Sequence, residues 1–318
     1  MKVTDVATRE ELKRFQEKSN LWGAYYVLFN WAFIAAIFAA VALWTHPLSI
    51  LVGVVLLGGR QLAFAALYHD AGHGLLFANK TLNHYVGQLL CAYPVLSDMP
   101  RYAKGHRRHH GLAGTERDPD LPNYAAYPIT RRSFRRKVMR DLTGRTGIKA
   151  VAAVWRRSKS AAFKAPWNGN FLLSQLIVNG ALFGALHATG HGALYLMWPA
   201  AYLTFHMLFA RLRQVAEHGA VPALYEPDPR LNTRTTYTAP WERLFVAPFN
   251  LNYHLEHHFV ATVPCYRLKA FHRFLKERGL YDDVDFPRSY RDLFTRLALR
   301  PNDDGDDGDD GHGTPAEA

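Results

Sequence analysis

The chain has 318 residues, a length that suits one large domain or two small ones. Its net charge is +11, and its mean hydropathy is only slightly negative (−0.16) although 20% of its residues are charged, which indicates apolar blocks separated by charged blocks. Two cysteines, Cys91 and Cys265, are too few for a disulfide framework, and the absence of a nucleic-acid-binding motif argues against nucleic acid as a partner.

Residues 1–20 are polar and charged, and we expect a partly helical cytoplasmic lead-in there, without a cleavable signal peptide. The next stretch, 21–44, is almost wholly apolar and long enough to cross a bilayer. A second apolar run, 50–67, follows a short connection, so the pair is interpreted as a transmembrane hairpin. His69 and His73 come directly after it, one helical turn apart.

Arg60 interrupts the second apolar run. A charge at membrane depth is costly, and such residues often have a function. The alternative is that Arg60 pairs with a backbone carbonyl or a neighbouring helix, or extends to the interface.

Residues 84–97 are moderately apolar but short and contain Pro94, so we interpret them as re-entrant or interfacial. The motif His106-Arg107-Arg108-His109-His110 follows. In a helix, positions i, i+3 and i+4 share one face, so these imidazoles point into one volume. An acidic loop, 114–120, comes next and lies close to them in sequence.

Residues 131–159 contain eleven Lys or Arg and one acid, Asp141. Two compatible interpretations stay open: these charges set the membrane topology, or the segment lies on the membrane and attracts anionic headgroups.

A second apolar pair covers 171–189 and 193–210. Both short connections, within the two hairpins, lack Lys and Arg, and every Lys and Arg except Arg60 lies before, between or after the hairpins. Four spans place those three segments on one side, which the positive-inside rule makes cytoplasmic. We therefore expect an integral protein of the cell's inner membrane (or of the endoplasmic reticulum in a eukaryote), with both termini and the histidine motifs cytoplasmic.

The HxxHH spacing returns at His254-Leu255-Glu256-His257-His258, and His218 follows the fourth apolar run by about two turns. Imidazole is a favoured ligand of iron, copper, nickel and zinc. Two metal ions with four or five ligands each would use all nine candidate ligands: His69, His73, His106, His109, His110, His218, His254, His257 and His258.

His187 and His191 share the spacing of the first motif but lie in the second external connection, so we expect them to be structural or merely polar. Five carboxylates close to ligands in sequence either orient imidazoles and offset metal charge or are ordinary surface groups. They are Asp70, Asp118, Asp120, Glu217 and Glu256.

The sequence thus predicts an all-α membrane protein with four transmembrane helices in two hairpins and a cytoplasmic helical cap that holds a His-rich dimetal site. Its parts are the lead-in 1–20, a membrane domain 21–295 and an acidic tail 296–318. Because repeated Asp and Gly cannot build a core, the tail is expected to be disordered.

The three motifs, in this order over residues 20–290, resemble the histidine boxes of the membrane fatty acid desaturase superfamily: HxxxH, HxxHH and HxxHH. The resemblance implies a non-haem diiron centre, O2 as co-substrate and an acyl or other lipid substrate. His218 matches a further ligand of that family, although Gln214 stands where the family usually has Asn. No His-Pro-Gly-Gly haem motif is present, so electrons are expected from a separate carrier such as ferredoxin or cytochrome b5.

Two other functions stay open at this stage. A hydroxylase or ketolase of the same superfamily has the same boxes and differs in how the substrate carbon lies against the metals. A membrane metal transporter is disfavoured, because transport sites lie near the bilayer midplane and these clusters lie beyond the ends of the spans.

Overall fold

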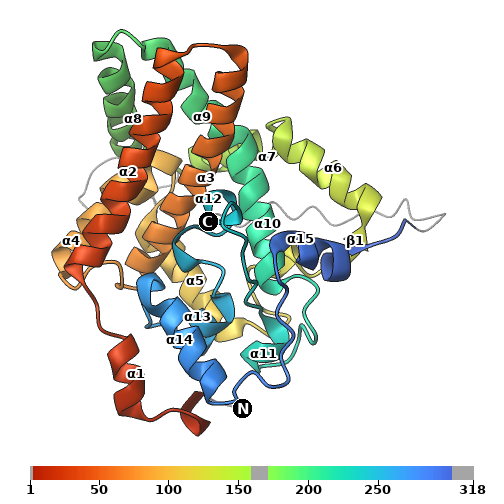
Figure 1. Ribbon diagram of the computed structural model, residues 1–318. Coiled ribbons are helices and arrows are strands. Elements are labelled where there is room, and N and C mark those ends of the chain that lie inside the picture. The colour runs from red at the N-terminus through yellow and green to blue at the C-terminus, as the bar shows by residue number, and fades with distance from the viewer. Residues whose placement is uncertain (1–2, 159–170, 303–318) are drawn as a thin grey trace.

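A computed structural model describes residues 3–158 and 171–302 of the chain. The described part is mainly helical (Figure 1). Its one sheet is a parallel pair of two-residue strands, β1 (Ile129–Thr130) and β2 (Leu299–Arg300). The all-α prediction is therefore correct apart from this short pair.

The apolar helices form one end of the molecule (Figure 1). They are α2 (Asn20–Leu43), α3 (Pro47–Gly72), α8 (Phe171–Ala188) and the helical run Gly192–His218, which comprises η5 (Gly192–Leu196), α9 (Met197–Ala201), the π-helical η6 (Tyr202–His206) and α10 (Met207–His218). The Ser19 hydroxyl accepts a hydrogen bond from the Trp22 backbone at the start of α2, and Pro47 occupies the first turn of α3, where a missing N–H costs nothing.

Three stretches are long and apolar enough to cross a membrane: Arg9–Leu43, Pro47–Gly72 and Gly192–His218. Helix α8 is also apolar, but its apolar part, Leu172–Ala188, is shorter than these three stretches. Three of the four predicted spans are thus present by length and composition, and the fourth stays a prediction.

The remaining helices lie beyond one end of the apolar helices or beside them toward that end (Figure 1). They are α1 (Arg9–Phe15), α4 (Lys80–Val86), α5 (Met99–Leu112), α6 (Arg131–Leu142), α7 (Arg145–Ser158), α11 (Pro229–Asn232), α12 (Glu242–Phe245), α13 (His254–Phe259), α14 (Cys265–Glu277) and α15 (Tyr290–Leu293). Short turns of other helix types complete them: η1 (Val3–Asp5), η2 (Gly87–Ala92), η3 (Tyr93–Val95), η4 (Leu121–Asn123), η7 (Pro248–Asn250) and η8 (Phe294–Ala298).

Helix α3 is the centre of the packing. Every residue from 57 to 71 is buried, so this part of the helix is covered on all sides. Helix α2, the run Gly192–His218, α5 and α12 all pack against it. Because α3 is packed on all sides, its last turn fixes the position of His69.

Arg60 lies in this buried part of α3, with 3% of its surface exposed. It donates a hydrogen bond to the Leu244 carbonyl of α12 (2.7 Å), lies 3.4 Å from the Asn30 side-chain oxygen of α2, and has its guanidinium over the Phe33 ring. Of the two interpretations from sequence, the structure favours the pairing with backbone and a neighbouring helix. Arg60 therefore ties α2, α3 and α12 together.

Two predicted segments extend beyond the described residues. The basic segment 131–159 forms α6 and α7, and its last residue, Lys159, lies outside the described part. The predicted tail begins at residue 296, yet η8 and β2 show that residues 296–300 belong to the folded body. Residues 303–318 lie outside the described residues.

Gly59 tests the close contact between α3 and α12. A Cβ added there would collide with the backbone of Leu244, which cannot move aside as a flexible side chain could. We expect Gly59→Ala to lower the free energy of unfolding by about 1–3 kcal/mol, the usual cost of overpacking, and to lower the melting temperature of the detergent-solubilised protein. Gly180→Ala on α8, where the added Cβ meets no atom within 4 Å, is the matched control and should leave the melting temperature unchanged or raise it. Equal melting temperatures for the two variants would contradict this packing.

Candidate metal centre

Two helix ends and two short helices supply the candidate ligands. His69 lies in the last turn of α3, and His73 is the residue at its C-terminal cap, so both imidazoles project from the end of α3. The three histidines of the second motif lie on one face of α5, where His106 and His109 are buried and His110 is half-buried. His218 is the last residue of α10, and the third motif forms most of α13.

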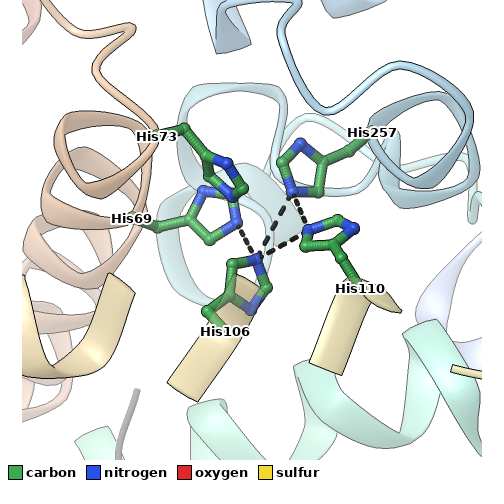
Figure 2. Close-up of side chains that lie close together, drawn as sticks. All are labelled: His69, His73, His106, His110 and His257. Carbon is green, nitrogen blue, oxygen red and sulfur yellow. Dashed lines mark hydrogen bonds between the residues drawn. The ribbon is translucent and has the colours of Figure 1, made fainter. Parts of the chain in front are cut away.

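Five of these imidazoles form the first group (Figure 2). The His106 Nε2 atom lies 2.8 Å from His69 Nε2, 3.0 Å from His110 Nε2 and 3.4 Å from His257 Nε2, and His110 Nε2 lies 2.9 Å from His257 Nε2. The His73 Nε2 atom is buried and has no hydrogen-bond partner. The group is His69, His73, His106, His110 and His257.

Four imidazoles form the second group, His109, His218, His254 and His258. The His254 Nε2 atom lies 2.9 Å from His218 Nε2 and 3.1 Å from His258 Nε2, and His258 Nε2 lies 3.3 Å from His109 Nε2. The two groups adjoin, because the His110 and His258 ring centroids are 4.3 Å apart. The structure thus brings all nine candidate ligands together and divides them into five and four.

Hydrogen bonds alone do not explain these contacts. A neutral imidazole has one N–H and one nitrogen lone pair, so one N–H at His106 Nε2 can serve only one of the three nitrogen atoms around it. The other lone pairs face one another in a buried site, which is unfavourable unless a cation lies between them. The donor set therefore fits metal ions that accept neutral nitrogen ligands.

Burial lowers the pKa of six of these imidazoles, which keeps them neutral at pH 7. Burial, reinforced by the neighbouring imidazoles, lowers the pKa of His73 to about 3 and that of His110 to about 2. Burial also takes the pKa values of four further histidines well below the usual range: His106, His254, His257 and His258. Since a protonated imidazole cannot bind a metal, the site is prepared for ligation at neutral pH.

The second nitrogen of several ligands is fixed by an outer partner. His109 Nδ1 donates to Asp118, with nitrogen–oxygen distances of 2.8 and 3.0 Å, and the Tyr124 hydroxyl donates to the same carboxylate. His218 Nδ1 donates to the Asn232 carbonyl (3.2 Å). Each bond places the proton on Nδ1, so Nε2 turns its lone pair toward the group.

The five carboxylates chosen from sequence have different positions. Asp118 is bonded to a ligand, and Asp120 lies 3.7 Å from the same His109 nitrogen. Glu217 lies 3.5 Å from His254 Nδ1 and accepts a hydrogen bond from Arg213. Asp70 lies 3.5 Å from His69 Nδ1 and accepts a hydrogen bond from the Cys265 backbone N–H.

Glu256 accepts no hydrogen bond from any of the nine imidazoles. Its carboxylate accepts hydrogen bonds from the hydroxyls of Thr235 and Tyr281 and from His272 Nδ1 (2.7 Å). These contacts attach α13 to α14 and to the chain before it. The prediction missed His272 in this role, because only the fold brings it beside the third motif.

His187 and His191 lie outside both groups. Both are exposed, and His191 Nδ1 lies 3.4 Å from the Thr189 hydroxyl within its own turn. His187 lies in the last turn of α8 rather than in the connection, and His191 lies in the turn that follows. Neither belongs to the two groups of candidate ligands.

A small polar cavity adjoins the second group. It has a volume of about 30 Å³, and its walls include His109, His218, His254, Arg213 and Gln214. The Arg213 Nε atom is buried and has no hydrogen-bond partner among the described residues. A volume of this size holds about two small molecules such as water, and is too small for a substrate headgroup.

A sequence model of the fatty acid desaturase family matches residues 45–290, which contain all nine histidines. The chain belongs to the fatty acid desaturase family. Together with the three apolar spans, this membership makes it a membrane-embedded oxidoreductase. The predicted resemblance is thereby confirmed.

One curated relative is the dihydrorhizobitoxine desaturase of Bradyrhizobium elkanii. It is 26% identical over 284 residues, which cover 82% of this chain and 78% of the relative. The similarity therefore extends over most of both proteins and supports an oxidation of the desaturase or hydroxylase type.

Asp118 and His187 provide a matched test of the centre. We expect Asp118→Ala to weaken metal binding about 10–100-fold, because His109 loses the partner that fixes its orientation. His187→Ala should leave the metal content unchanged. Metal per chain, measured by mass spectrometry after dialysis against a chelator, checks both. Loss of metal from His187→Ala in a correctly inserted protein, or full retention in Asp118→Ala, would contradict this assignment.

Proposed function

We propose that the nine histidines hold two iron ions and that the enzyme desaturates a lipid-linked acyl chain with O2. The observation that carries the proposal is the convergence of nine imidazoles, six buried and three half-buried, in adjoining groups of five and four. Nitrogen-only ligation suits iron, and family membership favours it over zinc or copper. The balanced reaction is R–CH2–CH2–R′ + O2 + 2 e⁻ + 2 H⁺ → R–CH=CH–R′ + 2 H2O.

When bound, the iron pair would supply the oxidising power that O2 alone lacks toward an unactivated methylene. The protein's part is to bind, orient and shield. His106 and His254, held neutral by burial, provide ligands without competition from protons. Asp118 and the Asn232 carbonyl hold ring orientations, and the small polar cavity beside His109 has room for O2 or product water.

An apolar substrate is favoured by the cavities among the apolar helices. One of about 630 Å³ lies between α7, α8 and the run Gly192–His218, and its walls include Trp155, Leu176 and Trp198. Another of about 450 Å³ lies between α2 and α8. Both have apolar walls large enough for part of an acyl chain.

Two alternative activities follow from specific observations. The relative is named for dihydrorhizobitoxine, so this compound is the second candidate substrate. Hydroxylation of a lipid would use the same histidines, since the outcome depends on the position of the substrate carbon.

We further propose that residues 21–295 form the catalytic unit in the cell's inner membrane, with both termini and the metal site cytoplasmic. The distribution of Lys and Arg supports this orientation. The connections after α2 and α8 lie at one end of the apolar helices, and α5, which bears the second motif, lies beyond the other end (Figure 1).

The proposed orientation predicts that reporters fused after His46 and after His191 both report an external location. A cytoplasmic signal at either position would place one hairpin the other way round. Such a result would contradict the arrangement of spans and leave the family assignment intact.

The proposed reaction predicts a product two hydrogens lighter than its substrate. The purified, iron-loaded enzyme should give it with O2, a reduced ferredoxin or cytochrome b5, and a lipid-linked acyl chain. Mass spectrometry separates this product from a hydroxylated one, which is one oxygen heavier. If the enzyme converts dihydrorhizobitoxine and no lipid-linked acyl chain, the proposed lipid substrate is wrong. If every product is hydroxylated, the proposed desaturation is wrong.

A further inference from the structure

Helix α5 has two opposite faces. His106, His109 and His110 lie within about 100° of one another around the helix and face the metal groups. Lys104 and Arg108 lie one turn apart on the far side, and both are exposed. Gly111 shares that side and Gly105 lies on its flank, and an added Cβ at either meets no atom within 4 Å. The outer face is therefore a low, open surface with a basic stripe.

No carboxylate in the part of the chain that the structure describes neutralises the charges of this stripe. Among the described residues, neither Lys104 nor Arg108 forms an ion pair with a carboxylate. Arg107, on the flank, donates instead to the Gly72 carbonyl at the end of α3 (3.3 Å). An exposed basic surface without internal partners attracts acidic molecules over long range.

We propose that this stripe, Lys104 and Arg108 with Gly105 and Gly111 beside them, is the docking surface for a small acidic one-electron carrier protein. This inference rests on the proposed function, because the reaction consumes two electrons, which two reduced carriers supply one at a time as each becomes oxidised. The stripe and three of the candidate ligands belong to the same helix. A carrier docked there is separated from the ligands by about one helix diameter, ~10 Å, with no other element between.

The basic helix α14 offers the matched control. Lys269 and Arg273 are also exposed, one turn apart, and carry the same charge. Helix α14 packs behind α13, however, and carries none of the nine candidate ligands. A carrier docked on α14 would be separated from the metal groups by a further helix, so electron transfer from there would be slower.

The test compares K104E/R108E with K269E/R273E in the full chain, each a reversal of two charges. The probe is a reduced [2Fe–2S] ferredoxin, and both its Kd and its KM are measured at low and high salt. We expect the α5 variant to raise both constants about tenfold and to reduce their salt dependence, because reversed charges remove the attraction. Turnover driven by dithionite with methyl viologen should stay within twofold of wild type, and the α14 variant should match wild type throughout.

Several results would overturn the docking surface. The first is an unchanged ferredoxin Kd in K104E/R108E, and the second is an equal or larger change of that Kd in K269E/R273E. The third is a K104E/R108E variant that binds phosphatidylglycerol vesicles more weakly but binds ferredoxin as wild type does. If K104E/R108E folds poorly, K104Q/R108Q replaces it, with a smaller rise expected. A wild-type enzyme that binds ferredoxin through this stripe but forms no product with either reductant would refute the proposed reaction and leave the docking surface in place.

Discussion

The fold depends on a constraint that it cannot satisfy by itself, the close approach of nine imidazoles with their Nε2 atoms directed inward. Contacts of 2.8–3.4 Å between nitrogen atoms in a buried site leave lone pairs opposed. Protonation would relieve that repulsion in solution, but burial holds the pKa values of His106 and His257 far below neutrality. Bound cations would relieve this repulsion, and their binding would contribute to the stability of the fold.

The helices and hydrogen bonds around the imidazoles hold them in this arrangement. The buried α3 supplies a rigid end for His69, and Arg60 ties it to α2 and α12. The outer layer of partners, Asp118 and the Asn232 carbonyl, turns individual rings. Glu256 acts differently, because it fastens α13 through Thr235, Tyr281 and His272 and contacts no ligand. Ring orientation and helix position are thus controlled by separate sets of residues.

Much of this arrangement could be predicted from the sequence because helical spacing carries it. The i, i+3, i+4 pattern places three imidazoles on one face of α5 and three on α13. The same geometry explains Glu256, which lies about 200° around α13 from His254 and so points away from the ligands. The positions of Asp118 and Asn232 could not be predicted in this way. Asp118 lies in an irregular loop, and Asn232 ends the four-residue helix α11, so tertiary contacts decide where both groups lie. The pairing of β1 with β2 likewise joins residues far apart in the chain.

The division of the histidines into groups of five and four is the central claim, and anomalous X-ray diffraction at the iron absorption edge tests it most directly. Crystals of the iron-loaded, full-length protein should show two iron peaks, one within His69, His73, His106, His110 and His257 and the other within His109, His218, His254 and His258. A single peak, or peaks at the zinc edge with none at the iron edge, would contradict a diiron centre in this protein.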